Sequence, residues 1–248
     1  MRSKKGLNLS RMYSSNFSLH KRHERNIKFI IIHYTGMKKE SAAIKKLCNP
    51  KSKVSSHYYI KKSGNILNLV PDLYEAWHAG KSNWKKYKLL NKYSLGIEMT
   101  NPGHQHGYKK FSKNQIISIR KLLKYLMKKY KIEKQNILGH SDISPERKRD
   151  PGENFPWKTL AKSNLSIWHK LNTKIIKKFR KIKLSSKKYE EKFINNLNKL
   201  GYVKIDKKKS SKNTKLLVTA FQRRFRQDLI NGKIDEECFL ISKNLLIS

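Results

Sequence analysis

The chain has 248 residues, of which 58 are lysine or arginine and 17 are aspartate or glutamate, and its formal net charge is +41. With 37% hydrophobic residues it can form one good-sized domain and a smaller companion. No apolar run approaches the roughly 18 residues that span a bilayer, so we expect a soluble protein. The two cysteines, Cys48 and Cys238, lie far apart and support neither a disulfide framework nor a structural zinc knuckle.

The excess of positive charge favours anionic partners. However, the lysines and arginines are spread over every segment and are not gathered in a motif that reads nucleic acid, so a nucleic-acid partner is not favoured. A composition rich in lysine, asparagine and isoleucine, without functional meaning, explains the charge at least as well. Nothing in the sequence indicates an oligomeric state.

Residues 1–25 form a basic, serine-rich segment with few apolar side chains. Such a segment has little to offset the entropy lost on ordering, so we expect a flexible tail. It also lacks the apolar middle of a secretory signal. This absence favours a cytoplasmic location, with the periplasm or the cell wall as the alternative.

The first buried strand is expected at residues 28–33, where consecutive apolar residues are typical of a strand buried on both faces. The strand ends at His33. In open α/β sheets, ligand sites gather at the carboxyl ends of the strands, so His33 is a candidate ligand residue. Residues 39–47 follow as a short helix that Asn49 and Pro50 close.

Residues 55–70 are predicted to form a hairpin around a turn at residues 63–65. Within it, His57 is interpreted as a core or supporting residue. The next segment, residues 77–84, reads WHAGKSNW, and its small residues and two tryptophans make a poor helix. We therefore expect a loop whose aromatic rings either line a substrate groove or pin the loop to the core.

Residues 94–99 have the alternation of a strand, with Glu98 on the opposite face from the apolar side chains. Glu98 is a candidate general base only if its face looks at a reacting centre. Residues 112–130 are the clearest helix in the sequence, with Ser112 as its N-cap and one apolar stripe that would cover the sheet.

Residues 139–157 read GHSDISPERKRDPGENFPW, and their three prolines and internal glycine forbid one continuous helix. This shaped loop offers an imidazole at His140, an ammonium at Lys148 and a carboxylate at Asp150. A catalytic zinc site usually takes three protein ligands and leaves one position open. His33 is the best candidate to complete a set with His140 and Asp150.

With these motifs in place, the chain resembles the zinc-dependent N-acetylmuramoyl-L-alanine amidases, a family that includes phage amidases and peptidoglycan recognition proteins. Five motifs in the family's order carry the resemblance: IIIHYT at 30–35, SSHYYI at 55–60, WHAGKSNW at 77–84, SLGIEM at 94–99 and the 139–157 loop. The resemblance implies an α/β fold, with a mixed central β-sheet flanked by helices, over residues 26–170.

The resemblance also implies the roles of the site residues. One Zn²⁺ would be held by His33, His140 and Asp150, while Glu98 and Lys148 would be the catalytic side chains. Substrate contacts would come from the loop at Trp77, His78, Ser82 and Trp84. The implied reaction cuts the amide between N-acetylmuramic acid and L-alanine in peptidoglycan or muropeptides. The alternative is a non-catalytic peptidoglycan recognition protein on the same fold.

Beyond the catalytic domain, residues 171–187 are densely basic and are predicted to be a linker. Residues 188–248 follow as a small module of three helices with apolar stripes. The segments LNKLGY at 197–202, AFQRRF at 220–225 and NGKID at 231–235 resemble the peptidoglycan-binding module often appended to wall hydrolases. Such a module would tether the enzyme to its substrate or simply pack on the catalytic domain.

Overall fold

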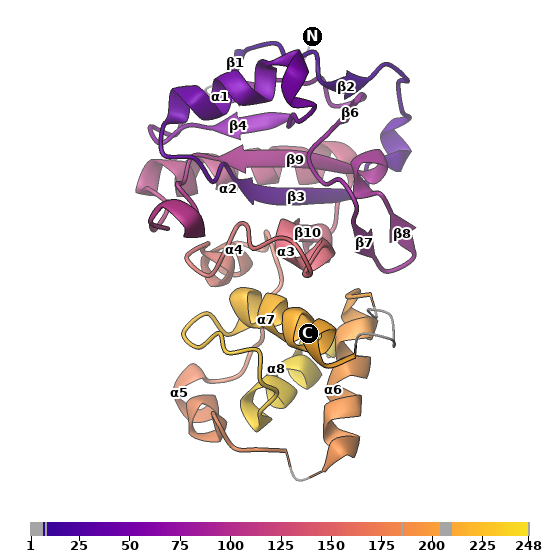
Figure 1. The fold of residues 1–248 in the computed structure, drawn as a ribbon, viewed down its shortest axis with the longest axis vertical. Coiled ribbons are helices and arrows are strands. Elements are labelled where there is room, and N and C mark those ends of the chain that lie inside the picture. Colours follow the sequence, from indigo (N-terminus) through magenta and orange to yellow (C-terminus); the bar gives the residue numbers. More distant parts are fainter. Residues whose placement is uncertain (1–6, 8, 185, 204–209, 248) are drawn as a thin grey trace.

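The computed structural model describes residues 7, 9–184, 186–203 and 210–247 (Figure 1). The centre of the fold is a mixed six-stranded sheet in the order β1-β5-β4-β9-β3-β10, in which only β4 and β5 pair antiparallel. Its strands are β1 (Leu9–Arg11), β3 (Phe29–Tyr34), β4 (Tyr58–Ile60), β5 (Ile66–Asn68), β9 (Ser94–Met99) and β10 (Ile137–Gly139). The predicted α/β fold with a mixed sheet is confirmed.

Short strands and helices complete the described chain. Two ribbons lie outside the main sheet, β2 (Phe17–Ser18) with β6 (Glu75–Ala76) and β7 (Asn83–Trp84) with β8 (Tyr87–Lys88). The helices are α1 (Glu40–Cys48), α2 (Lys113–Tyr130), α3 (His140–Ile143), α4 (Trp157–Lys162), α5 (Thr173–Ile176), α6 (Lys187–Leu200), α7 (Ser210–Phe225) and α8 (Glu236–Leu246). No helix in these described ranges combines the length and apolarity needed to cross a membrane.

Helix α2 covers one face of the sheet. As expected, Ser112 caps it: the Ser112 hydroxyl accepts from the Gln115 N–H while the Gln115 side chain accepts from the Ser112 N–H. This reciprocal pair satisfies two backbone donors at the start of the helix. The apolar stripe of α2 packs on Ile30 and Ile32 of β3 in a shared buried core.

The opposite face of the sheet is covered at two places. Helix α1 packs over β4 and β5, where Leu47 meets Tyr59. The C-terminal helices pack over the other end, so that Phe29 and Ile31 of β3 share a buried core with the module. His33 follows these two residues on the same face of β3, and it lines a cavity whose walls include residues of α1 and of the 139–157 loop.

The prediction of a flexible tail at residues 1–25 is wrong for residues 9–25; residues 1–6 and 8 lie outside the described chain. β1 pairs with β5 at the sheet edge, and β2 pairs with β6. Buried polar side chains add further bonds: the Ser14 hydroxyl donates to Leu47 O at 2.6 Å, and Arg22 donates to Asn91 O at 2.8 Å. Backbone pairing and polar contacts order this segment, and a count of its apolar residues could not predict them.

Residues 171–187, predicted as a linker, largely pack against the module. They contain α5, and Ile176 is buried in the core that the module shares with the sheet. Arg180 forms an ion pair with the buried Glu237 of α8, with Nε at 2.7 Å from Oε2. The three helices expected after residue 188 are present as α6, α7 and α8.

Candidate active site

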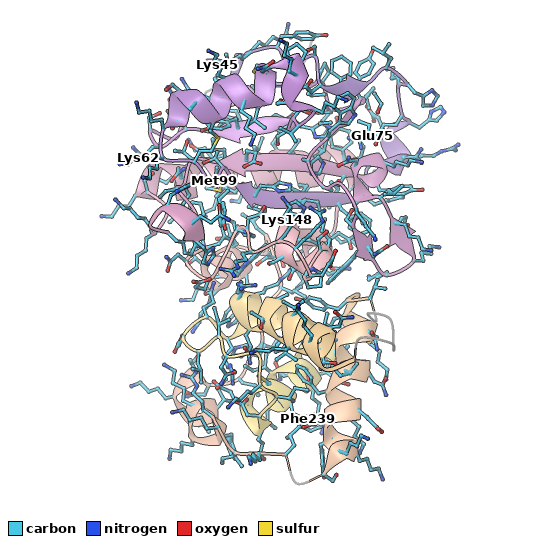
Figure 2. The ribbon with its side chains drawn as sticks, viewed as in Figure 1. Lys45, Lys62, Glu75, Met99, Lys148 and Phe239 are labelled. Atoms are coloured by element: carbon cyan, nitrogen blue, oxygen red, sulfur yellow. The ribbon has the colours of Figure 1, made fainter. Side chains whose placement is uncertain are left out.

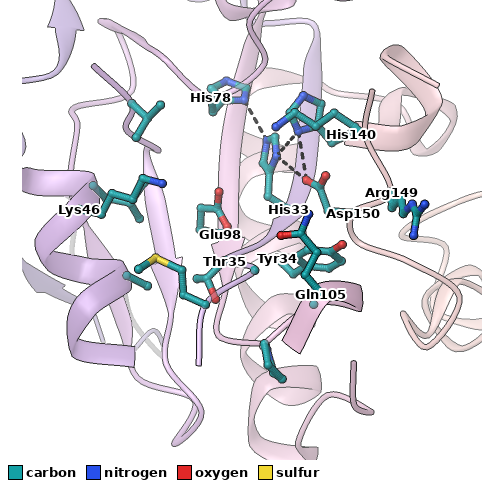
Figure 3. A pocket seen from close by; sticks show the side chains of 18 of the residues that line it. His33, Tyr34, Thr35, Lys46, His78, Glu98, Gln105, His140, Arg149 and Asp150 are labelled. Atoms are coloured by element: carbon teal, nitrogen blue, oxygen red, sulfur yellow. Dashed lines mark hydrogen bonds and ion pairs between the residues drawn. The ribbon is translucent and has the colours of Figure 1, made fainter. Parts of the chain in front are cut away.

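Three buried side chains converge at the carboxyl end of β3 (Figure 3). His33 Nδ1 lies 2.9 Å from His140 Nδ1 and 3.0 Å from Asp150 Oδ2, and His140 Nδ1 lies 3.1 Å from the same carboxylate oxygen. Strand pairing explains the approach of the two histidines, because β10 lies beside β3 with Gly139 opposite Ile32. His140 directly follows Gly139, and His33 directly follows Ile32, so the two candidate ligands lie side by side.

The three atoms are suited to hold a cation. Two imidazole nitrogens and one carboxylate oxygen form the nitrogen and oxygen donor set that zinc accepts. The second nitrogen of His140, Nε2, lies 3.1 Å from the carbonyl oxygen of Ala79. A carbonyl only accepts, so Nε2 carries the proton and the lone pair of Nδ1 is available to a cation bound between the three side chains.

His33 also has its proton on Nε2, and a chain of neutral hydrogen-bonding groups fixes this tautomer. The Ser94 hydroxyl donates to Leu90 O at 2.6 Å, so Ser94 Oγ accepts from His78 Nε2 at 3.3 Å. His78 Nδ1 is then free of a proton and accepts from His33 Nε2 at 3.0 Å. His33 Nδ1 therefore also presents a lone pair at the centre of the three side chains.

The electrostatics of the site agree with a neutral His33 and an ionised Asp150. Burial, followed by the neighbouring His140, lowers the pKa of His33 to about 4, so its imidazole is neutral at physiological pH. Burial alone would raise the pKa of Asp150, but its contacts with His140 and His33 outweigh this effect and lower the pKa. These are the protonation states in which both side chains bind a metal.

Glu98 lies next to this centre. β9 pairs with β3 so that Glu98 stands opposite His33, and both side chains point to the cavity side of the sheet. Glu98 Oε2 is buried and has no hydrogen-bond partner among the described residues. Burial and the charge of Asp150 raise the pKa of Glu98 to about 8. A carboxyl group with a free oxygen and this pKa can take up and release a proton near neutral pH.

All five residues with predicted metal or catalytic roles line one cavity of about 680 Å³. Lys148 lies on its wall, two positions before Asp150, and Lys46 of α1 faces the centre from the opposite wall (Figure 3). Arg147 and Arg149 also line the cavity. The site therefore combines a small anionic centre with several cations on its walls, an arrangement that attracts substrates carrying free carboxylates.

The four predicted substrate contacts divide into two pairs. Trp77 and His78 line the cavity, although His78 is buried and its ring is engaged by His33. Ser82 and Trp84 are not among the described residues that line it. The Ser82 hydroxyl is engaged within its own loop, and the indole of Trp84 packs edge-on against Tyr202 with ring centroids 4.8 Å apart. Ser82 and Trp84 thus fix the loop to the core, and their contact with substrate stays a prediction.

Two supporting residues were not singled out from the sequence. The Asn91 side chain accepts from the backbone N–H of His78 and, at 2.7 Å, from that of Ala79. Arg147 donates to the backbone carbonyls of Ala79 and Lys81. Together they hold the loop that orients both histidines. Arg147 could not be distinguished by residue type in a chain with 58 lysines and arginines.

This fold and site define an α/β domain with a potential His-His-Asp metal centre beside a carboxyl group of raised pKa. Residues 23–153 match the family model described as N-acetylmuramoyl-L-alanine amidase. The amidase AmiD of Escherichia coli is 33% identical over 236 residues, which cover 89% of this chain and 82% of AmiD. The anhydro-N-acetylmuramyl-L-alanine amidase AmpD of Haemophilus influenzae is 39% identical over 45% of this chain and 59% of its own.

Solved structures of amidases also match this fold. The complex of E. coli AmiD with the substrate anhydro-N-acetylmuramic acid-L-Ala-D-gamma-Glu-L-Lys superposes with a TM-score of 0.78 at 30% identity, covering 93% of this chain and 91% of AmiD. Pseudomonas aeruginosa AmpDh3 gives 0.74 at 26% identity, over 92% and 93% of the two chains. The chain belongs to the N-acetylmuramoyl-L-alanine amidase family.

Proposed function

We propose that this protein is a zinc-dependent amidase that hydrolyses the bond between N-acetylmuramic acid and L-alanine in muropeptides. The observation that carries the proposal is the meeting of three candidate metal ligands and the unpartnered carboxyl of Glu98 in one cavity. A recognition protein that had lost catalysis would have no need for a buried carboxyl beside the centre. The enzyme is therefore favoured over the non-catalytic alternative.

Each residue has a role in this scheme. His33, His140 and Asp150 would hold the ion, which supplies a Lewis acid that polarises a carbonyl and activates water. Glu98 takes the proton of the attacking water and passes it to the leaving amine of L-alanine. Lys148 places a positive charge near the carbonyl oxygen as it becomes negative.

The substrate class follows from the relatives and the charges of the cavity. The solved relatives include AmiD with an anhydromuropeptide and AmpDh3 with an anhydromuramic pentapeptide. The lysines and arginines on the walls here suit the free carboxylates of a peptide stem. We therefore propose soluble muropeptides as substrates. The peptidoglycan-binding role of the C-terminal module stays a separate prediction, which binding of intact sacculi would test.

The decisive experiment measures zinc content and release of L-alanyl peptides together. The purified protein should contain one zinc per chain, and chelation should abolish release from an anhydromuropeptide, with zinc restoring it. His33→Ala should lose both the metal and the activity. Zinc-free protein with full activity, or His33→Ala with unchanged activity, would contradict the scheme. Parallel reactions on intact sacculi separate soluble from polymeric substrate.

A further inference from the structure

The turn that carries His140 has little support of its own. α3 has four residues, and it closes through the Ser144 N–H donating to His140 O at 3.0 Å. The N–H of Ser141 donates to the backbone carbonyl of Asp150 at 2.8 Å. One short turn thus carries one candidate ligand and is hydrogen-bonded to the backbone of a second. Any contact that fixes this turn also fixes the geometry of the proposed metal site.

Asp142 is the contact that fixes the turn. Its Oδ2 accepts from the N–H of Gly139, the residue before His140, at 2.8 Å. Asp142 is only 2% exposed. A carboxylate at such depth is tolerated when a positive charge and further hydrogen bonds compensate it, and it becomes strongly unfavourable when the partner is removed.

The compensating groups come from the C-terminal module. Arg224 of α7 donates from Nη1 to Asp142 Oδ2 at 2.6 Å, and the hydroxyl of Tyr202 donates to Asp142 Oδ1 at 2.7 Å. Arg224 also donates to Ile137 O of β10 at 2.9 Å, and its guanidinium lies 4.6 Å from the ring centre of Trp157. The charge that Asp142 requires is therefore supplied from 82 positions further along the chain.

The module is fixed firmly enough for this contact to control geometry. Side chains fill the boundary between the two halves of the molecule (Figure 2), where Phe29 and Ile31 share a buried core with Phe221 of α7. The N–H of Lys85 donates to Gly201 O at 2.8 Å, next to Tyr202. The contact is continuous with the interior of the protein, unlike that of a domain held by a flexible tether.

We infer that the C-terminal module is part of the scaffold of the metal site, and that Arg224 and Tyr202 are positioning residues that act through Asp142 on His140. The inference rests on the proposed function in one respect, since it requires an ion bound by the three candidate ligands. It assigns the module a role inside the catalytic centre, in addition to any binding of peptidoglycan.

The test compares two arginines of the same segment in the full-length protein. Arg224→Met should weaken zinc binding by about 10- to 100-fold, the range typical of residues that support metal ligands. Arg226→Met is the matched control: Arg226 is also buried, but its ion-pair partners Asp235 and Glu237 belong to the module. Zinc affinity in the control should stay within about twofold of wild type. Competition with a chromophoric chelator measures both.

Two further variants keep the test informative if Arg224→Met does not fold. Tyr202→Phe removes one hydrogen bond and should weaken zinc binding by a few-fold. Combining Arg224→Met with Asp142→Asn removes the unpaired charge and should recover part of the lost affinity. The visible spectrum of the Co²⁺ form should change in Tyr202→Phe and remain that of wild type in Arg226→Met.

The possible outcomes separate the two proposals. Equal loss of zinc affinity in Arg224→Met and Arg226→Met, or no loss in Arg224→Met and Tyr202→Phe, would overturn the scaffold role while leaving the amidase proposal intact. A wild-type protein that binds no zinc would overturn both.

Discussion

The two candidate histidine ligands are held in different ways. His33 is the fifth residue of a six-residue strand, and it is oriented by a neutral chain of His78, Ser94 and a backbone carbonyl. His140 stands on a four-residue turn that depends on the ionic contact between Asp142 and Arg224. All groups that orient His33 belong to the catalytic domain, whereas the turn of His140 needs a contact from the C-terminal module. A strand within a sheet already fixes the backbone of a metal ligand, so only the side chain must be oriented. A short turn must also have its backbone fixed by a contact from elsewhere in the protein.

The largest expected effect comes from a residue that supports neither histidine. Glu98→Gln should lower the rate constant of hydrolysis by about 10²- to 10⁴-fold, because the amide cannot take up the proton of water. Zinc content should be unchanged, since Glu98 is not among the three candidate ligands. Steady-state kinetics with metal analysis checks both. Loss of zinc in this variant would mean that Glu98 also supports the metal. The metal ligands and the general base would then not be separate groups of residues.

His78→Phe tests the support of His33 directly. Phenylalanine keeps an aromatic ring but removes the acceptor of His33 Nε2, so His33 loses the group that fixes its tautomer. Zinc affinity should fall by about 10- to 100-fold. Trp77→Phe is a control on the same loop and should leave zinc affinity unchanged. Unchanged affinity in His78→Phe would show that the strand alone is sufficient to orient His33.

The pH dependence of activity should reflect the titration of Glu98, and not the groups that support His33 and His140. The raised pKa of Glu98, about 8, means that the basic carboxylate is lost as pH falls through this value. Each pH unit below the pKa lowers the carboxylate fraction about tenfold, and a bound cation moves this fall to lower pH. Activity should therefore fall on the acid side of the profile, and this limb should be absent from the residual activity of Glu98→Gln. An acid limb that persists unchanged in Glu98→Gln would exclude Glu98 as the base.

The smallest effect on zinc affinity is expected at Ser94, the residue of this hydrogen-bonded chain that lies farthest from His33. Ser94→Ala leaves His78 in place but removes the oxygen that fixes its proton on Nε2. Zinc affinity should fall only a few-fold, because His78 can still accept from His33 in one of its tautomers. Isothermal titration with zinc measures the change. An effect as large as that of His78→Phe would mean that the whole chain acts as one unit.

The central part of the site could be predicted from sequence because each residue lies in a recognisable local segment. His33 ends an apolar strand, Glu98 alternates with apolar neighbours, and the 139–157 loop is marked by its prolines. The contact between Asp142 and Arg224 has no such signal, because it joins residues far apart and no periodicity identifies one arginine among so many. The packing of Trp84 on Tyr202 had no sequence signal for a related reason, since Tyr202 lies far along the chain in the C-terminal module.

The short strand β1 has a consequence for solubility. It covers β5, and with only three residues, ending in the charged Arg11, it presents a poor template for another chain. A version of the protein that begins after residue 11 would expose the hydrogen-bonding groups of β5 along Ile66 and Leu67. Two such molecules could pair edge to edge, so shortening the amino terminus should promote aggregation although the cavity is untouched.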